Sequence, residues 1–197
     1  MLFLMMLIES EEDRSKMGLI YKLYHNYMYA IAADLLNSRS DAEDAVQEAF
    51  IRIIGFLDGI IEPKCLKTKH LCVIIVKRIA FDMLRRRRAR EKDTDPELID
   101  ELYDSPKASE MLEAVEDHSD LAAAMKALPD RYREAVLLRY SDEYSFEEIA
   151  RILNITEANA RKLVQRAVNK LRDAMEGKHA LPKTKLRMHE AKRKEVR

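Results

Sequence analysis

The sequence is poor in the residues that build tight turns and covalent cross-links. Its 197 residues include 4 glycines, 5 prolines, 2 cysteines and no tryptophan. So few turn residues, with abundant Leu, Ile, Ala, Glu, Lys and Arg, predict an all-α protein. Cys65 and Cys72 are too few for a disulfide framework, which favours a reducing cytosol. Their spacing around His70 fits no common metal site, so we expect neither a metal nor a cofactor.

Long apolar runs and catalytic motifs are missing as well. The N-terminal MLFLMMLI is short, has no basic residues before it, and is followed by acidic residues. We therefore expect no signal peptide and no membrane insertion, and predict a cytoplasmic protein. The sequence has no Ser-His-Asp arrangement, no HExxH, no glycine-rich phosphate loop and no Cys/His cluster, which argues against an enzyme.

The charged residues are balanced in number but segregated along the chain. Lys and Arg number 35, as do Asp and Glu, yet residues 91–127 hold 12 acidic and 3 basic residues. The acidic stretch also contains Pro96 and Pro106, as linkers often do. We predict two small helical domains, at residues 1–90 and 119–176, joined by an acidic linker at 91–118. The basic tail, residues 177–197, either contacts phosphates or serves only solubility.

Residues 145–172 have the pattern of a helix-turn-helix. Ser145 and Glu148 form the sequence signature of a capping box at the start of the first helix. Asn154 tolerates the left-handed backbone that ends a helix, and Thr156 is suited to cap the next one. The second helix has one apolar face, and two short helices joined by such a turn define the motif.

The outer face of that second helix is polar in a way that suits DNA. Asn and Gln can pair with adenine, and Arg and Lys with guanine, through two hydrogen bonds each. The alternative is an ordinary solvated face. We predict DNA contacts from Asn159, Arg161, Lys162, Gln165 and Arg166, with Arg161 reaching phosphates as easily as bases.

Three more helices are expected in the first domain, at about residues 17–37, 41–57 and 68–88. The outer side of the second carries Asp44, Gln47, Glu48 and Ile51. An exposed Ile on a polar stripe favours a docking surface, although single exposed Ile residues are common. The third helix is apolar nearly all round and ends in RRRRAR. These arginines, with Lys77 and Arg78, indicate a phosphate track or simply a soluble basic helix end.

Three stretches together resemble a family: DAEDAVQEAFIRII, VIIVKRIAFDMLRRRR and LPDRYREAVLLRYSDEYSFEEIARILNITEANARKLVQRAVNKLR. In this order, they resemble an RNA polymerase sigma factor of the extracytoplasmic-function (ECF) type, in the sigma-70 family. The resemblance covers about two thirds of the chain and implies a region 2-like and a region 4-like domain. It implies a transcription initiation factor whose partners are core RNA polymerase and promoter DNA, with an anti-sigma factor as a further candidate.

The resemblance also implies roles for individual residues. Asp44, Gln47, Glu48 and Ile51 would face the polymerase, and the segment 58–69 would capture a flipped base of the −10 element. The residues along the −10 DNA would be Lys77, Arg78, Asp82, Arg85 and Arg86. The helix-turn-helix would read the −35 element.

The chain departs from the family at a few positions. The family usually has a Trp near Leu71 and an Asn where this chain has Arg78, which suggests a different −10 preference or a phosphate contact. Its recognition helix often opens with Gly-Thr-Val where this one has Ala158, Asn159 and Ala160. The alternatives to a sigma factor are a helix-turn-helix regulator that acts without polymerase and a helical interaction protein that does not bind DNA.

Overall fold

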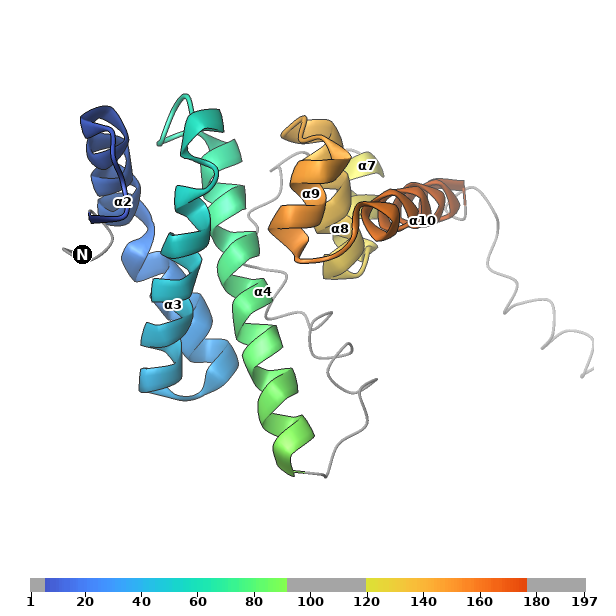
Figure 1. Ribbon diagram of the computed structural model, residues 1–197. Helices are drawn as coiled ribbons and strands as arrows, with labels where there is room; N and C mark the ends of the chain where they lie inside the picture. The colour runs from blue at the N-terminus through green and yellow to red at the C-terminus, as the bar shows by residue number, and fades with distance from the viewer. Residues whose placement is uncertain (1–5, 92–119, 177–197) are drawn as a thin grey trace, which may run out of the picture.

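The computed structural model describes residues 6–91 and 120–176, and these residues form helices without any strand (Figure 1). The all-α prediction is confirmed. Most of the acidic linker and the basic tail lie outside the described residues, so the predicted domain boundaries stay a prediction. The elements are α2 (Glu11–Leu36), α3 (Arg39–Ile54), the 3-10 turn η1 (Leu57–Gly59), α4 (Leu66–Glu91), α7 (Asp120–Ala127), α8 (Asp130–Val136), the π-turn η2 (Leu137–Ser141), α9 (Phe146–Leu153) and α10 (Glu157–Glu176).

Local capping explains why α2 and α3 begin and end where they do. The Ser10 side chain accepts a hydrogen bond from the Asp13 backbone at 3.3 Å and so starts α2. Asn37 ends that helix in the left-handed conformation, with φ of 48°. Ser38 then caps α3 by accepting from the Asp41 backbone. Because two residues suffice for the reversal, the two helices pack side by side as a hairpin.

Helix α4 is the centre of the molecule, as its uniformly apolar sequence predicts. Every residue from Leu71 to Val76 is fully buried. One side of α4 packs on α2 and α3, which with it form the N-terminal group of helices. The other side packs on α9, so α4 lies between the two groups in Figure 1.

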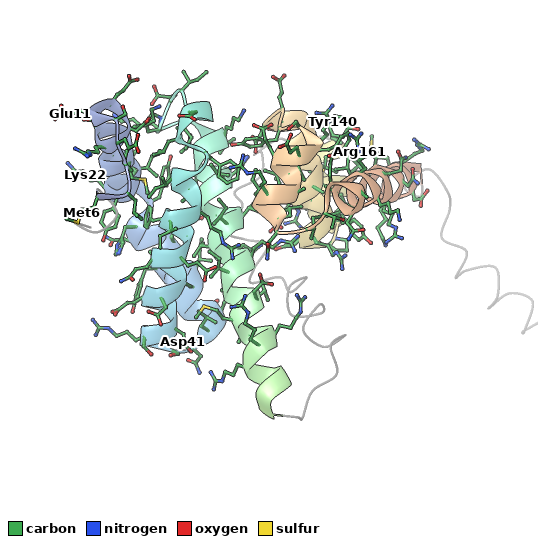
Figure 2. The ribbon with its side chains drawn as sticks, viewed as in Figure 1. Met6, Glu11, Lys22, Asp41, Tyr140 and Arg161 are labelled. Carbon is green, nitrogen blue, oxygen red and sulfur yellow. The ribbon has the colours of Figure 1, made fainter. Side chains whose placement is uncertain are left out.

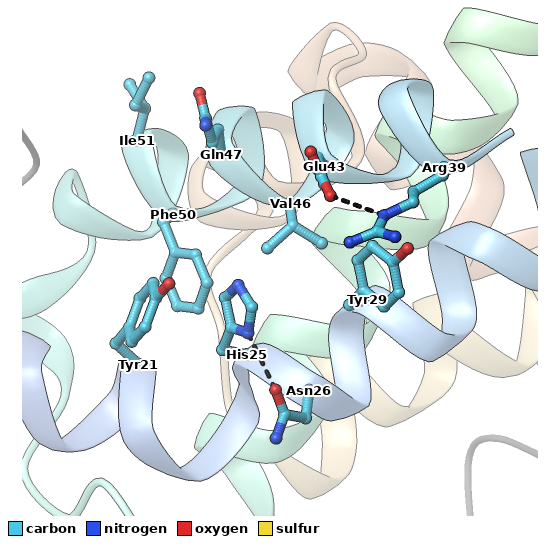
Figure 3. A pocket seen from close by; sticks show the side chains of 10 residues that line it. All are labelled: Tyr21, His25, Asn26, Tyr29, Arg39, Glu43, Val46, Gln47, Phe50 and Ile51. Atoms are coloured by element: carbon cyan, nitrogen blue, oxygen red, sulfur yellow. Dashed lines mark hydrogen bonds and ion pairs between the residues drawn. The ribbon is translucent and has the colours of Figure 1, made fainter. Parts of the chain in front are cut away.

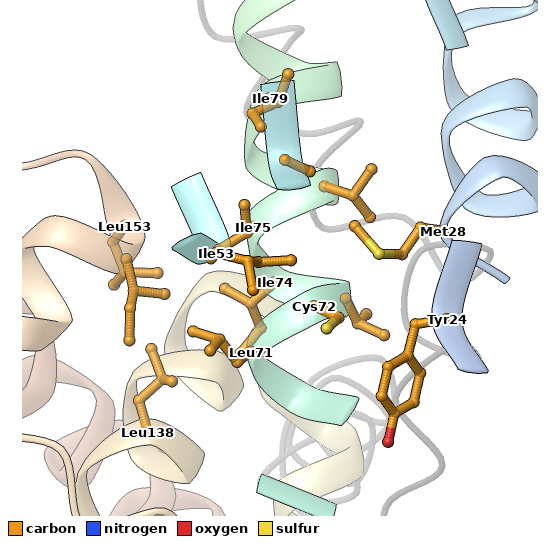
Figure 4. Packing of buried hydrophobic residues seen from close by; sticks show 14 of the residues in the cluster. Tyr24, Met28, Ile53, Leu71, Cys72, Ile74, Ile75, Ile79, Leu138 and Leu153 are labelled. Carbon is orange, nitrogen blue, oxygen red and sulfur yellow. The ribbon is translucent and has the colours of Figure 1, made fainter. Parts of the chain in front are cut away.

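The C-terminal group consists of α7, α8, η2, α9 and α10. Leu138 and Leu153 of this group face the side of α4 that carries Leu71 (Figure 4). One hydrophobic cluster therefore runs through both groups. At about 25 cal/mol per Å² of apolar surface, such burial favours the closed packing of the two groups.

Candidate polymerase and DNA interfaces

The predicted helix-turn-helix is present and is capped as its sequence indicates. The Ser145 hydroxyl accepts from the Glu148 backbone at 3.2 Å, and the Glu148 carboxylate accepts from the Ser145 backbone at 2.8 Å. Partial burial raises the pKa of Glu148, but these hydrogen bonds outweigh it and leave that pKa below its ordinary value. Asn154 is left-handed with φ of 53°, and Thr156 accepts from the Asn159 backbone at 3.3 Å.

The outer face of α10 is open to solvent. The helix buries Ala160, Leu163, Val164 and Ala167. The residues predicted to contact DNA are all exposed: Asn159, Arg161, Lys162, Gln165 and Arg166. The structure thus brings these five side chains to one helix, and contact with DNA stays a prediction.

Arg161, which is labelled in Figure 2, differs from its neighbours because it contacts other residues of the helix-turn-helix. Its guanidinium lies 4.5 Å from the Phe146 ring centre, and its Nε donates to Glu157 at 3.2 Å. A side chain held in this way is less free to follow a base edge, which favours a phosphate contact for Arg161.

The predicted docking residues Asp44, Gln47, Glu48 and Ile51 lie along the outer side of α3. Asp44, Gln47 and Ile51 are exposed, with Ile51 at 44 %, and Glu48 is half-buried and paired with Arg52. Gln47 and Ile51 also border a groove of about 790 Å³ between α2 and α3 (Figure 3). The remaining lining residues are Tyr21, His25, Asn26, Tyr29, Arg39, Glu43, Val46 and Phe50.

Sequence analysis missed the contribution of α2 to this surface. The rings of Tyr21 and Phe50 lie 4.9 Å apart, and those of Tyr21 and His25 lie 4.6 Å apart. The signal was available, because Tyr21, His25 and Tyr29 recur every four residues and therefore share one side of a helix. The candidate surface is thus a two-helix surface with an aromatic floor.

The structure places Lys77 differently from the expected exposed phosphate track. Its side chain is fully buried, and its Nζ lies 2.6 Å from Asp130 and 3.1 Å from Glu134, both on α8. Arg78 lies 3.7 Å from the other Glu134 oxygen. In this arrangement the C-terminal group covers Lys77 and this side of α4, and a contact of Lys77 with DNA stays a prediction.

The later part of the predicted track is more accessible. Arg85 and Arg86 are exposed, and Asp82 is half-buried. Asp82 lies 3.5 Å from Arg85 and accepts a hydrogen bond from Asn154 at 3.4 Å. The five predicted −10 residues therefore divide into an open end of α4 and a covered middle.

The segment 58–69, expected to capture a flipped base, encloses a small cavity together with Tyr144 of the C-terminal group. The cavity measures about 210 Å³, and Ile61 beside it is 95 % exposed. Lys67 lies 4.4 Å from the Tyr144 ring centre. Burial, followed by the nearby Asp142 and Glu148 carboxylates, raises the pKa of the Tyr144 hydroxyl.

His70 pairs with a carboxylate and takes no part in a metal cluster. Its Nδ1 lies 3.2 Å from both carboxylate oxygens of Asp142. Cys65 and Cys72 are free thiols, and burial raises the pKa of Cys72. Within residues 6–91 and 120–176, no group of three or more His, Cys, Asp or Glu side chains could hold a metal ion. No helix in these ranges is long and apolar enough to cross a membrane.

Comparison with known proteins agrees with this geometry. The family model described as sigma-70 region 2 matches residues 20–90, and the one described as sigma-70 region 4 matches residues 118–171. The ECF RNA polymerase sigma factor SigM of Bacillus subtilis (strain 168) is 31 % identical over 153 residues, which span 78 % of this chain and 91 % of SigM. The ferric citrate uptake sigma factor FecI of Escherichia coli (strain K12) is 26 % identical, over 76 % of this chain and 84 % of FecI.

Two helical parts that match sigma-70 regions 2 and 4 define a sigma factor. The chain belongs to the ECF group of the sigma-70 family. It is therefore a transcription initiation factor that binds RNA polymerase and gives it promoter specificity.

Proposed function

We propose that the two groups of helices divide the work of initiation. The outer side of α3 and the adjoining groove dock on core RNA polymerase. The segment 58–69 and the basic end of α4 contact the −10 element, and α10 reads the −35 element. Such a factor would act in the cytoplasm, where polymerase and promoter DNA are found. An anti-sigma factor as a further partner remains a prediction from the resemblance.

The exposure of Ile51 carries the docking assignment. Ile51 is 44 % exposed although the same helix buries six other apolar residues. It lies next to Gln47 at the rim of the groove, above the ring of Phe50 (Figure 3). An apolar anchor beside a concave aromatic floor, with polar residues around it, is the usual composition of an interface centre.

The test is the binding of core polymerase by Ile51→Glu. The added carboxylate should weaken binding at least tenfold, because a hot-spot contact contributes about 2 kcal/mol or more. Helicity and melting temperature should change little, since the side chain is partly exposed. Leu121→Glu is the matched control, because Leu121 is 49 % exposed on the C-terminal group. Equal losses in both variants, or normal binding by Ile51→Glu, would show that polymerase docks elsewhere.

A further inference from the structure

The backbone between η1 and α4 has no regular secondary structure from Ile60 to Cys65. A carbonyl group in such a stretch has no helical partner, so it must accept a hydrogen bond from a side chain, from a turn or from water. Side chains of α2 and α4 supply several of these bonds to the segment 58–69 and to Leu57 just before it. The shape of the segment therefore depends on residues outside it.

Two of these donors belong to α2. The Lys16 amine donates to the Leu57 carbonyl at 3.1 Å, and the Tyr24 hydroxyl donates to the Pro63 carbonyl at 2.8 Å. The Leu57 carbonyl also accepts from the Ile60 backbone at 3.0 Å. Helix α2 thus holds the backbone on both sides of the stretch 58–62.

The turn that leads into α4 is held from its other end. The buried Thr68 hydroxyl donates to the Glu62 carbonyl at 2.9 Å, and the same carbonyl accepts from the Cys65 backbone at 3.2 Å. The Glu62 carboxylate accepts from the Lys64 backbone at 3.0 Å. These bonds fix the backbone immediately after the exposed tip of the segment.

The held backbone presents one apolar side chain to solvent. Ile60 is extended, with φ of −91° and ψ of 102°, and its side chain is buried. Successive side chains of an extended backbone point to opposite sides, and Ile61 is accordingly 95 % exposed. The tip of the segment therefore has a defined outward side although it belongs to no helix.

Tyr24 is suited to a permanent positioning bond. Its side chain is buried, and this burial is the largest of the causes that raise its pKa to about 12. The hydroxyl consequently keeps its proton near neutral pH and remains a donor to the Pro63 carbonyl. A site that discriminates between ligands needs its contacting groups held to within about 0.5 Å by supporting residues of this kind.

We propose that Lys16 and Tyr24 of α2 are positioning residues for recognition of the −10 element. They set the backbone shape of the segment 58–69 and thereby its base preference, without contacting the DNA themselves. The inference rests on the proposed function, because it assumes that this segment contacts the −10 element.

The test uses the full chain assembled with core RNA polymerase and a promoter library with randomised −10 bases. Tyr24→Phe keeps the buried ring and removes only the donor to Pro63. The ratio between the preferred and the disfavoured base at one −10 position should fall about fivefold, the factor to which one typical net hydrogen bond amounts. Affinity for core polymerase and the base preference at the −35 element should stay at the parent values.

Lys16 provides a second variant and a rescue. Lys16→Met keeps most of the apolar stem, removes the donor to Leu57 and should relax the same −10 position by a smaller factor, because Lys16 is only half-buried. Lys16→Arg keeps a cationic donor and should restore most of the parent preference. A loss of preference in Lys16→Arg as large as that in Lys16→Met would contradict a role for this hydrogen bond.

A matched control separates positioning from stability. Ser38 caps α3 in the same group of helices, and Ser38→Ala removes the bond that it accepts from the Asp41 backbone. This variant should lower the melting temperature about as much as Tyr24→Phe and leave the −10 preference unchanged. Equal relaxation in Ser38→Ala and Tyr24→Phe would overturn the inference, since stability alone would then explain both.

Ile61→Ser distinguishes this inference from the proposed function. Because Ile61 lies at the exposed tip, its substitution should change the −10 preference if the segment contacts DNA. A changed preference in Ile61→Ser, with parent preferences in Tyr24→Phe and Lys16→Met, overturns the inference and leaves the proposed function standing. An unchanged −10 preference in Ile61→Ser would overturn the proposed contact of the segment with the −10 element, and the inference with it.

Discussion

Helices α4 and α10 both carry cations predicted to contact DNA, yet these cations differ in their exposure to solvent. On α10, Lys162 and Arg166 stand on an exposed face. On α4, Lys77 is fully enclosed by carboxylates of another helix. Helix α10 buries only one side, so its sequence decides what is exposed. Helix α4 is enclosed on two sides, so its exposure depends on how the two groups of helices are packed.

The largest expected effect is the loss of folding stability when the buried amine of Lys77 is removed. Lys77→Ala should destabilise the closed protein by about 3–5 kcal/mol, because it leaves two buried carboxylates without their main counter-charge. Urea denaturation at constant ionic strength measures the change. Lys162→Ala is the control, and it should change stability by less than about 0.5 kcal/mol, as exposed substitutions do. Similar losses of stability in both variants would show that Lys77 is not more deeply buried than Lys162.

The next largest effect concerns the base preference at the −35 element, which we expect to depend on α10. Gln165→Ala and Lys162→Ala should each cost about 1–3 kcal/mol at one position of the −35 element, since each removes a base contact. Transcription from promoters with randomised −35 bases, with added polymerase, would reveal the relaxed position. Arg161→Ala should lower affinity for all promoters alike and reduce the salt dependence by about one unit.

Lys170→Ala provides the control on the same helix. The Lys170 amine lies 5.4 Å from the Tyr132 ring centre, within the C-terminal group. Its substitution should therefore leave the base preference at the −35 element unchanged. An unaltered −35 preference in both Gln165→Ala and Lys162→Ala would mean that α10 does not read sequence, and promoter choice would then depend on the N-terminal group.

The smallest effect is the loss of stability when the capping box at the start of α9 is removed. Ser145→Ala should cost about 1 kcal/mol near neutral pH, because it removes one side of the capping box. The lowered pKa of Glu148 means that the folded protein favours its ionised form, so this stability is present above its ordinary pKa of 4.5 and is lost as the pH falls below it. Because Ser145→Ala keeps the backbone N–H that the Glu148 carboxylate accepts from, the pH test uses Glu148→Gln, and thermal melting at a series of pH values should show the parent and Glu148→Gln converging in acid. A constant difference would indicate that Glu148 does not contribute through its charge.

Local features of the structure could be predicted from the sequence because local chemistry determines them. The box at Ser145 and Glu148 and the left-handed Asn154 follow from residues a few positions apart. The burial of α4 and the exposure of Ile51 follow from helical periodicity. The boundaries of the three helices of the first domain agreed to within three residues, except that α2 begins at Glu11, six residues before the expected start.

The pairing of Lys77 could not be read in this way. Its partner Asp130 is 53 residues away, beyond the acidic linker, and no periodic pattern indicates which helix covers another. The apolar sequence of α4 predicts that the helix is buried, but not which helices pack against it. The groove between α2 and α3 is an intermediate case, because the spacing of Tyr21, His25 and Tyr29 marks a shared side of α2, whereas the contribution of Phe50 depends on packing.

The match between Lys77 and its two carboxylates has a consequence for exchanging parts among relatives. A chimaera that keeps α4 of this chain but takes its C-terminal group from another sigma factor would close over Lys77 with no assurance of an acid at positions 130 and 134. Such a hybrid should either fail to close or fold poorly, whereas one that carries Asp130 and Glu134 with the foreign helices should behave normally. The two groups are therefore interchangeable only when these three side chains are transferred together.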